Sequence, residues 1–123
     1  MAAPNLLSPT IITGKTVFSF LPSTAATSIL SNAISSGKVL KVNTLNIANY
    51  GLNAATITIG IYSAAAIGGT MYHIAGTITV PANSTLNLID KTSTIYLEED
   101  RSLGAIAGTA NTLSIVTSYE EIG

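Results

Sequence analysis

The chain has 123 residues, a formal net charge of −1 and charged side chains at only 9% of its positions, against about a quarter in an ordinary soluble domain. Its five lysine and arginine residues are scattered, so there is no basic stripe that could follow phosphates, and nucleic acid is not expected as a partner. The absence of cysteine excludes disulfides, thiolate metal sites and thiol catalysis.

Apolar residues are frequent, but polar residues interrupt every apolar run well before the roughly 18 residues that a membrane-spanning helix needs. No membrane association is therefore expected. Residues 1–9 have neither a basic start nor a sustained apolar core, which is not typical of a signal peptide. We expect the protein to remain inside the producing cell until lysis.

The first residues predict an extended arm, because prolines remove backbone donors and favour extended geometry in the residue before them. We place this arm at residues 1–12 of one domain that spans residues 1–123. Its apolar side chains would have little reason to be there unless they dock, for example by adding a strand to an adjacent subunit. The candidate interface residues of the arm are Pro4, Leu6, Leu7, Ile11 and Ile12.

After the arm, short extended segments follow one another, separated by turn signals about every eight to twelve residues. The expected strands are Thr10–Phe20, Ala25–Leu30, Gly37–Tyr50, Ala55–Tyr62, Thr70–Val80, Ser84–Ile89, Thr94–Leu97, Arg101–Ala107 and Thr112–Ile122. No helical pattern exceeds one turn, so crossover helices for parallel strands are missing. The sequence predicts an all-β fold, a single antiparallel β-sandwich of about eight strands that is jelly-roll-like or immunoglobulin-like.

The longest segment changes phase in its middle. Leu40 and Val42 share one face, whereas Leu45 and Ile47 share the other, which predicts a bulge or a bend. In the later segments the alternation predicts inward side chains at Ile57, Ile59, Ile61, Tyr72, Ile74, Ile78, Val80, Leu86, Leu88, Leu103, Ala105, Leu113, Ile115, Thr117 and Tyr119. A flexible hairpin loop is expected at residues 63–69.

Few side chains could carry chemistry. His73 is the only histidine and its phase predicts an outward position. The acidic run Glu98–Asp100 could offer oxygens to a hard cation, but adjacent carboxylates diverge and a solvated turn is expected, as at Glu120–Glu121. Residues 83–85 match the pattern for N-glycosylation, but we expect them to form only the polar turn after Pro81. We predict no catalytic, cofactor or metal site, and no enzymatic activity.

The faces that point outward carry almost no charge. They include Thr56, Thr58, Thr77, Thr79, Ser114, Val116 and Ser118. Sheet edges usually protect themselves with lysine, proline or bulges, and here these defences are thin. A neighbouring subunit is therefore expected to cover edges or faces, and we predict a homo-oligomer.

The chain resembles the small virion structural proteins of tailed phages, particularly those of marine cyanobacterial hosts. The resemblance covers nearly the whole chain. It is carried by MAAPNL at 1–6, SNA and SGKV within 31–39, LNIAN at 45–49, YHIA at 72–75, ITVPANSTL at 78–86, IYLEED at 95–100 and SYEEI at 118–122.

The resemblance implies a non-enzymatic β-sandwich that decorates or cements the capsid, bound to the major capsid protein, often as a trimer. It also implies localisation in the virion, assembled in the host cytoplasm. One departure is the loop at 64–69, which is longer and more apolar than in the family, so Ile67 joins the candidate interface residues. The alternative is a tail, neck or fibre component that binds a host glycan through Tyr50, Tyr62 and Tyr72.

Overall fold

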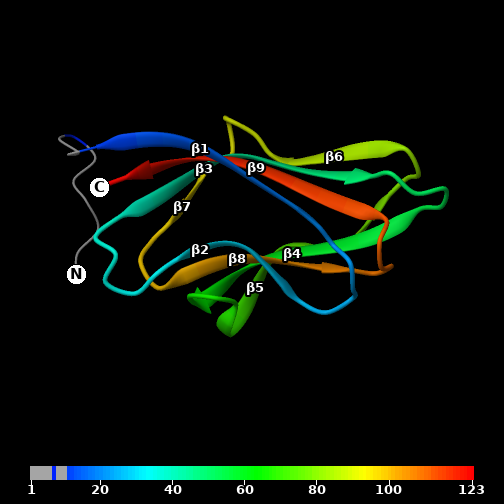
Figure 1. The fold of residues 1–123 in the computed structure, drawn as a ribbon, viewed down its shortest axis with the longest axis horizontal. Coiled ribbons are helices and arrows are strands. Elements are labelled where there is room, and N and C mark those ends of the chain that lie inside the picture. The colour runs from blue at the N-terminus through cyan, green and yellow to red at the C-terminus, as the bar shows by residue number, and fades with distance from the viewer. Residues whose placement is uncertain (1–6, 8–10) are drawn as a thin grey trace.

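The computed structural model describes Leu7 and residues 11–123, and the part that it describes is built from strands (Figure 1). The strands are β1 (Ile12–Phe20), β2 (Thr27–Asn32), β3 (Val39–Asn49), β4 (Ala55–Ala64), β5 (Gly68–Val80), β6 (Ser84–Ile89), β7 (Ile95–Leu97), β8 (Arg101–Ala107) and β9 (Leu113–Ile122). Among the described residues no helix is long and apolar enough to cross a membrane.

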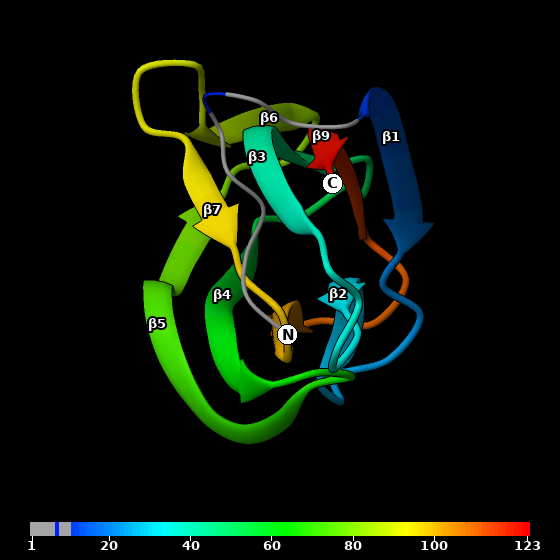
Figure 2. The same cartoon turned by 90° about the vertical axis from the view of Figure 1, so that its left-hand side faces the viewer.

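The strands form two antiparallel sheets that pack face to face (Figures 1 and 2). The five-stranded sheet has the order β1-β9-β3-β6, with β7 also paired to β3, and the four-stranded sheet has the order β2-β8-β4-β5. The prediction of an all-β antiparallel sandwich is confirmed, and each of the nine segments expected from the sequence contains one strand.

The phase change in β3 is a register shift. β3 pairs with β9 in one register up to Val42 and in another from Thr44 onward. The extra residue turns the second half of the strand over, so that Leu40, Val42, Leu45 and Ile47 all reach the core. This confirms the predicted bulge.

Most of the predicted inward residues line one core between the sheets. Ile57, Ile59, Leu103, Leu113 and Ile115 are fully or almost fully buried. Thr117 and Tyr119 are also buried, whereas Ile61, Leu86 and Leu88 are half-buried against the core. Alternation therefore located the inner faces of β4, β6, β8 and β9.

The prediction for β5 was wrong in part. Tyr72 is 66% exposed and Ile78 also reaches solvent, whereas Ala75 is buried. Two register shifts between β4 and β5 flank Ile59, and Thr77 takes a positive φ of 51°. These irregularities break the alternation along β5, an edge strand that bends around the outside of the sandwich (Figure 2).

The loop between β4 and β5 is held down, contrary to the expected flexible loop. The amide of Ala65 donates to Asp100 Oδ1 (3.0 Å), and the amide of Ala66 to Ser31 Oγ (2.9 Å). The amide of Ile67 donates to Ser102 Oγ (2.8 Å). Three consecutive amides are thus bound by side chains of β2, β8 and the β7–β8 turn.

Two buried asparagines join the sheets. Asn49, at the end of β3, donates from Nδ2 to the carbonyl oxygens of Asn53 and Val80, both at 2.9 Å, and its Oδ1 accepts from the amide of Gly51 (2.9 Å). Asn32, at the end of β2, donates to the carbonyl oxygen of Leu97 on β7 (3.0 Å). Because buried amide groups are costly when unpaired, each side chain fixes one sheet against the other.

Candidate interaction surface

Four large apolar side chains are exposed close together at the five-stranded sheet. Phe18 and Phe20 on β1 are 78% and 67% exposed, Val116 on β9 is 42% exposed, and Tyr50, just after β3, is 49% exposed. We call these four residues the apolar face. Contiguous exposed apolar side chains on a folded protein indicate a contact with another protein.

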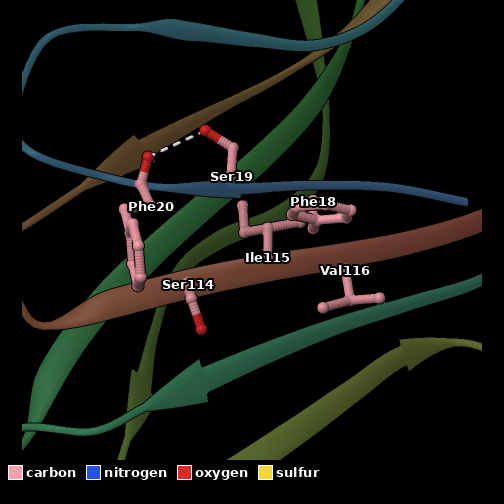
Figure 3. Close-up of a pocket in the computed structure, with 6 residues that line it drawn as sticks. All are labelled: Phe18, Ser19, Phe20, Ser114, Ile115 and Val116. Carbon is pink, nitrogen blue, oxygen red and sulfur yellow. Dashed lines mark hydrogen bonds between the residues drawn. The ribbon is translucent and has the colours of Figure 1, made fainter.

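Phe18, Phe20 and Val116 border a shallow hollow of about 450 Å³, together with Ser19, Ser114 and Ile115 (Figure 3). Strand geometry explains the cluster, because Phe18 lies opposite Val116, and Phe20 opposite Ser114, in the pairing of β1 with β9. The Tyr50 ring extends the face, with an edge-to-face contact to Phe20 at a centroid distance of 5.7 Å. That geometry is favourable for aromatic pairs.

The positions next to the apolar face carry no charge. Val116 and Ser114 pair on their other side with Asn46 and Ala48 of β3. Those two pair in turn with Asn87 and Thr85 of β6. This part of the sheet can therefore be covered by protein without burying an ionised group, which is the costly step in covering a surface.

The charges of this sheet gather at its other end. Lys15 Nζ and Lys38 Nζ lie 3.0 and 3.5 Å from Glu121 Oε2. The hydrogen bond from Lys15 lowers the pKa of Glu121 below its ordinary value of 4.5, and the same bond raises the pKa of Lys15. The ion pair joins the first and last strands of the chain.

Acid is expected to weaken this connection. A carboxyl with a lowered folded-state pKa stabilises the fold above its ordinary pKa and loses that contribution as the pH falls through the lowered value. Between about pH 6 and about pH 3 the Glu121→Gln variant should therefore lose less in Tm than the wild type, with a difference of no more than about 4 °C for so exposed a pair. Thermal melts followed by circular dichroism would measure it, and parallel pH profiles would contradict the assignment. Asp90→Asn is the positive control and should also lose less in Tm than the wild type, because the hydrogen bonds from Thr92 lower the pKa of Asp90 independently of this ion pair.

The predicted arm residues are only partly described. Ile11 continues the pairing of β1, since its amide and carbonyl bond the carbonyl and amide of Gly123 at 3.0 and 2.9 Å. Ile12 begins β1, and both isoleucines and Leu7 are exposed. Pro4 and Leu6 lie outside the described residues, and the interface role of the arm stays a prediction.

Ile67 is half-buried in the pinned β4–β5 turn, close to Gly104 of β8. The three tyrosines of the glycan alternative do not form one exposed surface. Tyr62 is buried. Tyr50 follows β3 of the five-stranded sheet, whereas Tyr72 lies on β5 of the four-stranded sheet. Tyr62 therefore offers no ring face to a sugar.

His73 is exposed on β5, as expected from its phase. The acidic run Glu98–Asp100 forms a turn in which Asp100 serves the fold by accepting the Ala65 amide, while both carboxylate oxygens of Glu99 are buried without a hydrogen-bond partner. Within the described part of the chain no three His, Asp or Glu side chains are placed to hold a metal ion.

Phe18 and Phe20 were not among the surface residues predicted from the sequence. Both lie in a predicted strand in which β-branched and aromatic residues occupy both phases, so either phase could have been the inner one. The available signal was the pair of phenylalanines two positions apart, which must share a face in a strand.

No protein-family model matches the chain, and no curated protein matches it in sequence. Among solved structures, a chain of the disulfide-linked pili that form Bacillus endospore appendages is similar, with a TM-score of 0.54 and 16% identity over 90% of this chain and 87% of that one. A chain of the acid-stable capsid of a Helicobacter pylori bacteriophage is also similar. Its TM-score is 0.54, with 7% identity over 94% of this chain and 90% of that one. At these identities the likeness shows a shared sandwich fold.

Proposed function

We propose that this chain is a non-enzymatic structural subunit of a tailed-phage virion, and within it a capsid decoration or cement protein. Its partners would be further copies of itself and the major capsid protein, and its location the virion, assembled in the host cytoplasm. The observation that carries the proposal is the apolar face, which lies in an uncharged part of the five-stranded sheet and is suited to burial against protein.

The fold also supports this proposal. The two similar structures described above come from assembled particles, one a phage capsid and the other a pilus. The pilus likeness is the weaker guide to function, because those pili are described as disulfide-linked and this sequence has no cysteine. The trimeric state implied by the sequence resemblance stays a prediction.

A tail, neck or fibre component is the second candidate, and the exposed Tyr50 and Tyr72 are the observation in its favour. Aromatic rings can stack on sugars, but Tyr50 already packs against Phe20 and the buried Tyr62 contributes nothing. Binding on a glycan array that is lost in Tyr72→Ala, with an unchanged melting curve, would favour this candidate.

The number of copies in each particle tests the proposal. Quantitative mass spectrometry of purified virions, calibrated with labelled peptides, would give the ratio of this chain to the major capsid protein. A ratio near one, or a simple fraction of it, is expected for a protein distributed over the shell. A ratio of a few per cent would move the protein to the tail, neck or fibres, and its absence would overturn the virion role.

The arm can be tested on the same particles. Deleting residues 1–9 is expected to lower occupancy on the capsid while the isolated protein still folds, because β1 begins only at Ile12. Unchanged occupancy would remove the arm from the proposed interface and leave the apolar face as the contact.

A further inference from the structure

One edge of the five-stranded sheet is built to accept another strand. β1 pairs with β9 on one side, and none of the described residues pairs with its other side. The pairing of β1 runs without a shift over the whole strand, from Ile12 opposite Ile122 to Phe20 opposite Ser114. The edge strand β7 is also paired without a shift, but it has only three residues. The pairings of the edge strands β2, β5 and β6 all contain register shifts, which is one way natural sheets prevent edge-to-edge association.

The hydrogen bonds identify which residues face the open side. Ile11 and Gly123 exchange both backbone bonds, and Leu21 donates to Leu113. In an antiparallel pair such residues alternate with residues whose amide and carbonyl point away. The residues of β1 that turn their backbone groups to the open edge are therefore Ile12, Gly14, Thr16, Phe18 and Phe20.

Two of these residues carry the exposed rings of β1, because the side-chain direction and the direction of the backbone groups both alternate with period two along a strand. Thr13 and Lys15, of the other phase, are exposed near the start of the strand. Phe18 and Phe20 thus offer their rings on the outer face and their amides at the edge. The carbonyl of Phe20 already accepts the hydroxyl of Ser19 (2.9 Å; Figure 3). β1 contains no proline, and its one lysine, Lys15, is bound to Glu121.

From these features we infer that β1 pairs antiparallel with β1 of a second copy about a two-fold axis at Thr16. The inference rests on the proposed function in taking the partner to be the chain itself, and it replaces the trimer that the sequence resemblance implies with a dimer. In this register the whole of β1 is matched. Thr16 lies opposite Thr16, Gly14 opposite Phe18, and Ile12 opposite Phe20.

The register is complementary in shape. A Cβ added to Gly14 would meet no atom within 4 Å, so there is open space above this glycine. The ring of Phe18 from the other copy would lie directly across from that space, an arrangement in which an aromatic side chain covers a strand glycine. The pairing of Ile12 with Phe20 adds an aliphatic–aromatic contact, and such cross-strand pairs stabilise sheets.

The register is also complementary in charge. It places Lys15 opposite Val17, so the lysines of the two copies do not face each other. A shift that centred the axis on Lys15 would put like charges in direct opposition, which is destabilising. The two apolar faces then lie on the same surface of one continuous sheet, at opposite ends of the paired strands, and both stay available to the capsid.

Charge placed on the axis tests this pairing. In Thr16→Lys two lysines would oppose each other, and in Thr16→Glu two glutamates would do so. Each change is expected to weaken dimerisation roughly 100-fold. An equimolar mixture of the two variants should recover a dimer that contains one copy of each. Thr85→Lys is the matched control, because Thr85 is an exposed threonine of the same sheet on the opposite edge strand.

Sedimentation velocity and native mass spectrometry over a concentration series would provide the readout. A wild-type dimer, monomeric single variants, a mixed heterodimer and an unaffected Thr85→Lys support the inference. A wild-type monomer or trimer, a Thr16→Lys that still dimerises, or a mixture that stays monomeric would overturn it. The ratio to the major capsid protein does not depend on this result, so the failure of one proposal can be told from the failure of the other.

Hydrogen exchange on the unmodified protein gives a second test that needs no variant. The amides of Ile12, Gly14, Thr16, Phe18 and Phe20 should exchange at least about tenfold more slowly as the concentration passes through the dimerisation range. The alternate amides already bond to β9 and should change much less. Equal behaviour of the two sets would contradict the pairing.

Discussion

Replacing Asn49 by alanine is expected to lower the free energy of unfolding by about 3 kcal/mol or more. The substitution removes three hydrogen bonds and leaves the carbonyl of Val80 and the amide of Gly51 without the partners that Asn49 provides. A net hydrogen bond contributes about 1 kcal/mol, and a buried group left unpaired costs about 1–3 kcal/mol. Because the bond to Val80 links β3 to β5, the loss also loosens one sheet from the other.

Urea denaturation followed by circular dichroism would measure the effect. Asn87→Ala is the matched control, since Asn87 is an exposed asparagine on β6, and such a change is expected to stay within about 0.5 kcal/mol. An Asn49→Ala variant as stable as Asn87→Ala would show that the link between the sheets is energetically unimportant.

Gly104→Val should destabilise the sandwich by a similar amount. A Cβ at Gly104 would lie 2.6 Å from Cε1 of Tyr62 and 2.9 Å from Cγ2 of Ile67. Tyr62 is buried and Ile67 is held by its bond to Ser102, so neither can give way without moving the β4–β5 hairpin. Overpacking of this kind costs about 1–3 kcal/mol for small additions, and the two methyl groups of valine place the cost at the upper end or above.

Gly14→Ala is the control at concentrations below the dimerisation range, because in the single chain it adds a Cβ to a strand glycine with open space above it. It should be neutral or slightly stabilising, since alanine loses less backbone entropy on folding than glycine. Equal melting temperatures for Gly104→Val and Gly14→Ala would mean that the hairpin is not packed against Gly104 as described. Gly104→Ala should lower the melting temperature by less than Gly104→Val does.

The alternation of apolar residues was sufficient to predict the fold. Ile57, Ile59, Leu113 and Ile115 gave their inner faces directly, since a strand beside a core must keep period two. The phase change between Val42 and Leu45 even predicted the irregularity in β3. These features depend on local sequence alone.

The parts that were missed depend on the partners of a strand. Tyr72 was predicted to be inward, but the register shifts beside Ile59 and the positive φ at Thr77 change the phase of β5. Nothing in the local pattern marks these positions. Phe18 and Phe20 have an ordinary strand pattern, and only the packing of the two sheets shows that their phase points away from the core.

The hydrogen bonds that hold the β4–β5 hairpin at 65–67 were not predicted, for a related reason. Its small residues and the two glycines that follow them are typical of a mobile loop. The groups that hold it, Ser31, Asp100 and Ser102, lie 35 positions away in the chain. Such distant hydrogen bonds have no signature in a single sequence.

The pairing of β1 with β9 has a consequence for how the molecule is made. Lys15 and Glu121 are 106 positions apart in the chain, so β1 leaves the ribosome long before β9 and cannot pair with it until β9 has emerged. Until then β1 has two open edges, and a strand with Phe18 and Phe20 and little charge is prone to unwanted association in that interval. Contacts so distant in sequence also form slowly. We therefore expect the yield of folded protein to depend on chaperones and on the rate of synthesis more than on the stability of the finished sandwich.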